Sequence, residues 1–260
     1  MKIQTTANLL LITLTLLFTH ATRAADCDHH LPYGIPTGGT GDKIICYSGF
    51  VLSYDYEMKV SSWVSYTITK NSVHGANVKR ASSFKIDKNI PRQYSSSGSD
   101  YSRSGYDRGH LAPSAQIDYS RQANNETFLY SNMTPQLPGF NRDMMGHSGA
   151  WGNVEGLVRK WIYKHEELNI IAGTYFNSEA EFIGNGVGIP AAFYKIILNT
   201  VTGDSISFWF PHVENTASQL ASYVVPIDEI ELRTGIDFFS KIPDSAEDYI
   251  ERKSSEVTRF

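Results

Sequence analysis

The chain has 260 residues, with 23 Lys and Arg against 27 Asp and Glu, which gives a formal net charge of −4 at pH 7. This length suffices for one large domain with a substantial core. The negative balance argues against a surface that is basic throughout, although a cleft can still focus a local positive field.

The first 24 residues have the pattern of a cleavable secretory signal. Lys2 supplies positive charge, an apolar run covers residues 9–18, and small residues surround Arg23 near the expected cleavage point. A membrane anchor is the alternative, but the run is shorter than the about 20 residues that a spanning helix needs. We expect residues 1–24 to be removed and residues 25–260 to form a single domain, secreted or periplasmic. Without Lys2 and Arg23, that domain carries a net charge of −6.

Cys27 and Cys46, the two cysteines of the sequence, both lie near the start of the expected mature chain. In an oxidising compartment, two cysteines placed in this way most simply form one disulfide. It would stabilise the fold by roughly 3 kcal/mol, because it closes a short loop. The alternative is a metal site that adds His29 and His30, but Cys46 does not clearly supply the required spacing.

Hydrophobic patterns predict the secondary structure along the rest of the chain. Strands are expected at residues 50–52 and 63–69, followed by an exposed loop at 94–106 that is rich in Ser, Gly and Tyr. A helix is expected to begin near Trp151, because apolar side chains recur there at helical spacing. Further strands are expected at residues 169–172, 193–198 and 206–210. Strands on both sides of a helical middle favour a mixed α/β fold over an all-β sandwich.

Glu155 and Arg159 lie one turn apart on the predicted helix, at the border of its apolar arc. The simplest interpretation is an exposed ion pair that contributes about 0.3–0.5 kcal/mol. The alternative is that the helix edge holds the carboxylate in a cleft. The spacing alone favours the exposed pair.

Four separated polar motifs occupy the region between Tyr106 and Glu155. They are Asp107-Arg108-Gly109-His110, Ser131-Asn132-Met133-Thr134-Pro135-Gln136, Gly139-Phe140-Asn141-Arg142, and a Trp-x-x-x-Glu pattern that begins at Trp151. Each motif alone is weak, since a histidine beside an Asp and an Arg is more often a surface or packed residue. In this order, however, they resemble the DNA/RNA non-specific endonuclease family, which includes Serratia-type secreted nucleases and mitochondrial endonuclease G.

The resemblance extends over most of the expected mature chain. Arg80 resembles an arginine of the family that reaches the phosphate. The segments that resemble other family elements are 36–39, 63–66, 172–173, 189–195 and 228–235. The resemblance implies a mixed α/β (α+β) fold in which a ββα-metal site accompanies a central antiparallel sheet flanked by helices.

The resemblance also implies how the polar residues divide the chemistry. His110 would be the general base, because a neutral imidazole with a pKa of about 6.5 can accept a proton from water near neutral pH. The three arginines Arg80, Arg108 and Arg159 would bind phosphate or the charge that develops on it. Asp107 and Asn132 would orient the site.

A divalent metal is implied as the cofactor. Asn141 would bind it through its amide oxygen, and Glu155 would hold metal-bound waters, a set that suits Mg²⁺, with Mn²⁺ as an alternative. In the typical family pattern the asparagine stands four residues before the helix tryptophan, whereas Asn141 precedes Trp151 by ten. His147 occupies the position four before Trp151 and is a second candidate ligand, the alternative being an ordinary loop histidine. A nitrogen donor would favour softer ions.

The resemblance and the residues that carry it imply an endonuclease that hydrolyses DNA and RNA and leaves 5′-phosphate and 3′-hydroxyl ends. Nucleic acids are its expected partners, without membrane association. A serine hydrolase is one alternative, but Gly146-His147-Ser148-Gly149-Ala150 lacks the final Gly of a nucleophile elbow and follows no strand pattern. A catalytically silent binding module of the same fold is the other alternative. The retained His, Asn, Glu and Arg residues favour activity.

Overall fold

The computed structural model describes residues 27–39, 41–75, 78–142, 149–214 and 220–252, together with residues 257 and 260. The expected signal segment 1–24 lies outside these residues. Within the described part of the chain, no helix combines the length and the apolar character needed to span a membrane.

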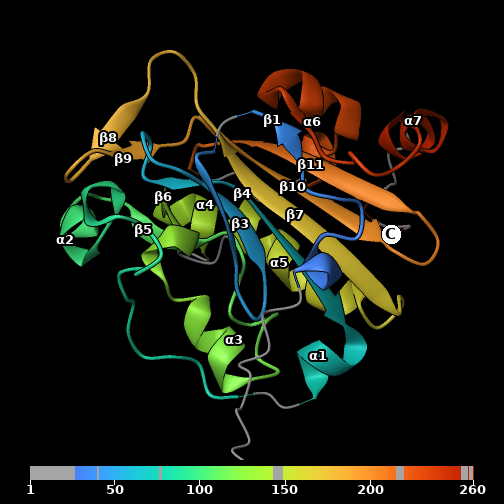
Figure 1. Ribbon diagram of the computed structural model, residues 1–260, viewed down its shortest axis with the longest axis horizontal. Coiled ribbons are helices and arrows are strands. Elements are labelled where there is room, and N and C mark those ends of the chain that lie inside the picture. The colour runs from blue at the N-terminus through green and yellow to red at the C-terminus, as the bar shows by residue number, and fades with distance from the viewer. Residues whose placement is uncertain are drawn as a thin grey trace, which may run out of the picture.

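A six-stranded antiparallel sheet forms the centre of the domain (Figure 1). In spatial order its strands are β11 (Ser205–Pro211), β10 (Ala192–Asn199), β7 (Glu167–Tyr175), β4 (Val60–Thr69), β3 (Val51–Asp55) and β2 (Lys43–Cys46). The β4–β7 pairing joins the two halves of the chain, with Trp63 opposite Gly173 and Thr69 opposite Glu167. All five predicted strands overlap strands of this sheet, so the expected mixed α/β fold with a central antiparallel sheet is confirmed.

Both faces of the sheet are covered by helices (Figure 1). The predicted helix is α5 (Ala150–Trp161), and its apolar side packs with side chains such as Tyr66, Ile170 and Phe193 on one face. The other face packs against α6 (Ile227–Thr234) and α7 (Asp244–Arg252). Because both faces are covered, nearly every residue of the central strands β4 and β7 is buried, including polar ones such as Ser65 and Asn169.

Shorter elements surround this framework. The helices are α1 (Lys70–His74), α2 (Gly98–Tyr101), α3 (Arg121–Glu126) and α4 (Pro138–Asn141). The paired short strands are β1 (Thr37–Gly38) with β12 (Ile236–Asp237), β5 (Asp107–His110) with β6 (Met133–Gln136), and β8 (Glu181–Ile183) with β9 (Val187–Ile189).

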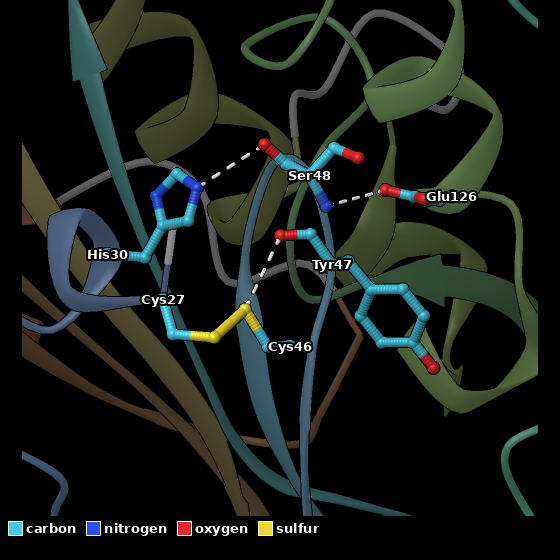
Figure 2. Close-up of a disulfide and its surroundings, with 6 residues drawn as sticks. All are labelled: Cys27, His30, Cys46, Tyr47, Ser48 and Glu126. Carbon is cyan, nitrogen blue, oxygen red and sulfur yellow. Dashed lines mark hydrogen bonds between the residues drawn. A yellow bond between two sulfur atoms is a disulfide. The ribbon is translucent and has the colours of Figure 1, made fainter. Parts of the chain in front are cut away.

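Cys27 and Cys46 form the expected disulfide, with their Cα atoms 5.8 Å apart (Figure 2). It attaches the segment before the short helix Asp28–His30 to the edge strand β2. The imidazole of His30 is buried, and its Nδ1 accepts a hydrogen bond from the Thr67 backbone N–H at 3.1 Å. The disulfide is therefore confirmed in place of the alternative metal site, and His30 serves to hold the N-terminal segment against β4.

The expectation of an exposed loop over residues 94–106 is wrong in its middle. Helix α2 lies there, and Asp100 accepts hydrogen bonds from the backbone N–H groups of Ser97 and Asn185, at 2.7 and 2.9 Å. Tyr101 is buried, with its ring stacked 5.9 Å from that of Tyr130. The Ser- and Gly-rich composition is typical of a loop, but it does not reveal that a capped turn can dock an aromatic side chain between distant segments.

Replacing Cys27 and Cys46 together with Ser is expected to lower the free energy of unfolding by roughly 3 kcal/mol, because the unfolded chain regains the freedom that the cross-link removes. Urea denaturation of the variant and of the oxidised parent measures the difference. Reduction of the parent with dithiothreitol should produce a similar loss. An unchanged unfolding midpoint in both experiments would show that the bond contributes nothing.

Candidate active site

Strands β5 and β6 and helix α5 form the frame of the candidate site (Figure 1). The two strands pair antiparallel, with His110 opposite Met133. The indole Nε1–H of Trp151, in the first turn of α5, donates to the backbone carbonyl of His110 at 3.0 Å. This bond joins the helix directly to the last residue of β5 and completes the ββα arrangement expected from the sequence.

His110 lies at the end of β5, with its ring between two phenylalanines. Phe128 meets it edge-on at a centroid distance of 5.1 Å, and Phe84 lies 5.8 Å away. Nε2 is buried, and no described residue forms a hydrogen bond with it. Burial lowers the pKa of His110 to about 3, and the positive charge of Arg80 acts in the same direction. The imidazole is therefore neutral near pH 7.

Two arginines reach the same phenylalanine rings from outside. The guanidinium of Arg80 lies 4.8 Å from the ring centroid of Phe128, and that of Arg108 lies 4.7 Å from the centroid of Phe84. Arg80 is also held by a hydrogen bond from Nη1 to the hydroxyl of Ser114 at 2.6 Å. Both arginines are exposed, so two accessible cations stand beside the neutral imidazole of His110, whose Nε2 is buried.

Asp107 orients the amide of Asn141 at the end of helix α4. Its Oδ2 accepts hydrogen bonds from Asn141 Nδ2 at 3.0 Å and from Arg142 Nε at 2.7 Å. An ionised carboxylate can only accept hydrogen bonds, so the amide nitrogen must face Asp107. The amide oxygen of Asn141 receives no hydrogen bond from any described residue, and it is therefore the atom available to a ligand.

The chain between Asn141 and Trp151 closes on itself at Arg142 and Gly149, where the backbone N–H of Gly149 donates to the carbonyl of Arg142 at 3.3 Å. The six residues between them, with the candidate ligand His147, lie outside the described residues. Without these six residues, Asn141 would precede Trp151 by four positions. A Cβ at Gly152 would meet the carbonyl oxygen of Asn141 at 2.8 Å, so α4 touches the first turn of α5.

Glu155 faces a buried lysine that the sequence analysis did not assign to the site. The Glu155 side chain is 18% exposed, and its Oε1 lies 3.9 Å from Nζ of Lys195, which is fully buried in β10. The same ammonium lies 3.8 Å from the ring centroid of Trp151, and no described residue forms a hydrogen bond with it. Arg159 is not within ion-pair distance of Glu155, so the exposed i,i+4 pair is not formed.

Burial raises the pKa of Glu155, whereas the charges of Lys195, Arg159 and Arg80 oppose that shift. Burial also lowers the pKa of Lys195 to about 8, although the carboxylate of Glu155 opposes it. The lysine stands on the face of β10 that also carries Phe193 and Ile197. A lysine on the buried face of an apolar strand was the signal in the sequence that could have identified it.

Asn132 is fully buried and does not reach the accessible surface of the site. Its Oδ1 accepts from the backbone N–H of Ala112 at 2.9 Å, and its Nδ2 donates to the carbonyls of Ala112 and Thr127, both at 2.9 Å. These bonds fix the backbone that follows His110. An orienting function of Asn132, as expected from the resemblance, would act through this backbone.

His212 is another residue that the sequence analysis missed. Its Nε2 accepts from the backbone N–H of Leu137 at 2.8 Å, so its Nδ1 carries the proton that is donated to the Pro190 carbonyl at 2.8 Å. Burial lowers the pKa of His212 to about 4. The neutral ring thereby anchors the residue that precedes α4, the helix that carries Asn141.

Comparisons with known proteins agree with this geometry. The family model described as DNA/RNA non-specific endonuclease matches residues 29–245. A nuclease of Nostoc sp. is 32% identical over 86% of this chain and 85% of its own length, and mitochondrial endonuclease G of Caenorhabditis elegans is 33% identical over 75% and 68%. The crystal structure of an EndoG/EndoGI complex matches with a TM-score of 0.76 at 30% identity, over 84% of this chain and 93% of that one. The chain therefore belongs to the DNA/RNA non-specific endonuclease family and is a nuclease, an enzyme that hydrolyses the phosphodiester bonds of nucleic acids.

Proposed function

We propose that this nuclease is an exported endonuclease that cleaves both DNA and RNA by attack of water on phosphorus, with His110 as the general base. The observation that carries the proposal is the neutral imidazole between the cations of Arg80 and Arg108, attached through Trp151 to the helix of Glu155. Contacts to phosphate do not distinguish the two nucleic acids, which supports action on both.

His110 would accept the proton from the attacking water. In the free protein its pKa of about 3 makes it a weak base, because the ring is buried beside a cation. A bound phosphate would neutralise much of the charge of Arg80 and so raise the pKa of His110. Substrate binding would in this way increase the basicity of His110, the residue that accepts the proton.

The three arginines would bind the phosphate and the negative charge that grows on it in the transition state. Arg80 and Arg108 lie on the side of His110, and Arg159, in the last turn of α5, is near enough to Glu155 to lower the pKa of that carboxyl. Cleavage of the bond to the 3′ oxygen, with water entering opposite to it, leaves 5′-phosphate and 3′-hydroxyl ends.

Nucleases of this family generally depend on a divalent metal ion, and we assign Mg²⁺, with Mn²⁺ as an alternative. Asn141 would hold it through Oδ1, and Glu155 would hold its waters. Among the described residues, the one group of three acidic side chains close enough to hold a metal lies in α6 and α7, away from the candidate site. At the candidate site the protein would therefore supply few ligands, and the ion would keep most of its waters, as Mg²⁺ prefers. When bound, the ion would stabilise charge on the non-bridging and leaving oxygens.

The choice of Asn141 over His147 is supported by the hydrogen bond between Gly149 and Arg142. This bond brings Gly149 next to Arg142. Counted without residues 143–148, Asn141 therefore stands four residues before Trp151, as in the family pattern. The amide held by Asp107 also presents an oxygen, the donor type that Mg²⁺ favours.

Export is supported by the signal pattern of residues 1–24 and by the disulfide, since such bonds persist mainly in oxidising compartments. Sequencing the N-terminus of the exported protein tests this part of the proposal. A start at Ala25 or Asp26 is expected.

Replacing His110 with Ala should lower the turnover of plasmid DNA and of RNA by at least about a hundredfold, because the proton of water loses its acceptor. Binding of a fluorescent oligonucleotide should persist. His29→Ala, at an exposed histidine outside the site, is the matched control and should keep parental activity. Near-parental cleavage by the His110 variant at pH 8 would refute the assignment of the base, and 3′-phosphate product ends would refute the direction of cleavage.

Deleting residues 143–148 should leave the Mg²⁺ response of the enzyme largely intact, because the deletion joins Arg142 to Gly149, which are already hydrogen-bonded. Asn141→Ala in the parent should abolish that response. Activity against Mg²⁺ and Mn²⁺ concentration, together with isothermal titration of both ions, measures the effect. If the deletion removes metal binding and Asn141→Ala retains it, then His147 is the ligand.

Lys195→Met should shift the acid limb of the activity profile to higher pH. Lys195 lowers the pKa of Glu155, so removing its charge raises that pKa further, and the carboxylate is lost at a higher pH as the solution is acidified. Activity from pH 5 to 9 at saturating substrate measures the shift, and Lys195→Arg serves as the charge-preserving comparison. A uniform loss of activity without a shift would mean that Lys195 acts only in packing.

A further inference from the structure

A basic hollow lies beside the candidate active site, with a volume of about 310 Å³. Four of its lining residues are cationic and the others are small or neutral. They are Lys79, Arg80, Lys85 and Arg121, with Ala81, Ser82, Ser83 and Asn125. No acidic residue lines it, although the chain as a whole carries a net charge of −4.

The four cations of the hollow are exposed, and none of them forms an ion pair within the described part of the chain. Four like charges around one hollow repel one another, and this arrangement is unfavourable without a counter-charge. The hollow therefore attracts an anion, and its hydroxyl and amide groups can donate hydrogen bonds to that anion's oxygens.

The walls of the hollow are tied together by hydrogen bonds. Arg121, at the start of α3, donates from Nη1 to the carbonyl of Lys79 at 2.5 Å, and the backbone N–H of Ala81 donates to Oδ1 of Asn124 at 3.2 Å. The backbone N–H of Lys85 donates to the carbonyl of Phe128 at 3.0 Å. The segment that carries three of the cations is thus attached to α3 and to the residues that follow it.

Arg80 belongs both to this hollow and to the candidate active site. Its guanidinium lies over the Phe128 ring, and the centroid of that ring is 5.1 Å from the centroid of the His110 ring. A polyanion whose reacting phosphate lies beside His110 and Arg80 therefore has the hollow next to that phosphate, on the side of Arg80.

We propose that the hollow is a second phosphate subsite, in which Lys85 and Arg121 bind a phosphate of the substrate strand next to the one that is cleaved. The proposal rests on the proposed function and deepens it. Because the contacts are made to phosphate, the subsite strengthens binding of DNA and RNA alike and selects strands over single phosphodiesters. It also explains how an acidic protein holds a polyanion.

The test combines Lys85→Gln and Arg121→Gln in one variant and compares it with Lys164→Gln/Lys241→Gln, which removes two exposed charges that do not line the hollow. Binding of a fluorescent single-stranded 12-mer is measured by anisotropy in a His110→Ala background with EDTA, so that no cleavage occurs. The Kd is expected to rise on the order of tenfold in the hollow variant. The slope of log Kd against log salt concentration is expected to fall by about 1.

The second measurement is hydrolysis of bis(p-nitrophenyl) phosphate, made with His110 intact in the parent and in the hollow variant. This substrate has one phosphodiester and cannot occupy both sites, so the hollow variant should cleave it at the parental rate while its KM for the 12-mer rises. Unchanged binding of the 12-mer, or an equal loss in the control variant, would overturn the subsite. An equal loss on both substrates would also overturn it, because the substitutions would then act on the active site. Failure of the proposed function has a different signature, namely undiminished cleavage by His110→Ala.

Discussion

The arrangement of the candidate site depends on Trp151. Its indole N–H holds the carbonyl of His110, and its ring carries the ammonium of Lys195 at 3.8 Å. The same ring packs against Phe140, the neighbour of Asn141, and against Phe193 of β10. One fully buried side chain therefore links the strand of the proposed base, the helix of Glu155, the turn of the proposed metal ligand and the central sheet.

The electrostatics of the site follow from the depth at which these groups are buried. Desolvation keeps His110 and His212 neutral and weakens the preference of Glu155 for its charged form. Lys195 opposes the effect of desolvation on Glu155, because a nearby cation stabilises the charged form of a buried carboxylate. Fixed charges and dipoles in a partly desolvated site stabilise a transition state without having to reorient, which is the main advantage of this construction.

The sequence predicted those features that depend on local pattern. Strand-like apolar and alternating runs identified the sheet, the apolar arc of 151–162 identified α5, and the four motifs identified the family. The features that it missed depend on contacts between distant segments. Lys195 is 40 positions from Glu155, and His212 is 75 positions from Leu137. In the same way, α2 is buried because Tyr101 meets Tyr130 and Asp100 meets Asn185.

Because Gly149 is hydrogen-bonded to Arg142, the number of residues between them can change without changing the geometry of the site. A segment whose two ends already touch can grow or shrink at small entropic cost, about 0.6 kcal/mol for each doubling of its length. Neither α4 nor α5 has to move when that length changes. Evolution can therefore vary the residues between these two helices, next to the proposed metal ligand, and alter what the enzyme contacts around its substrate while the reacting groups keep their positions.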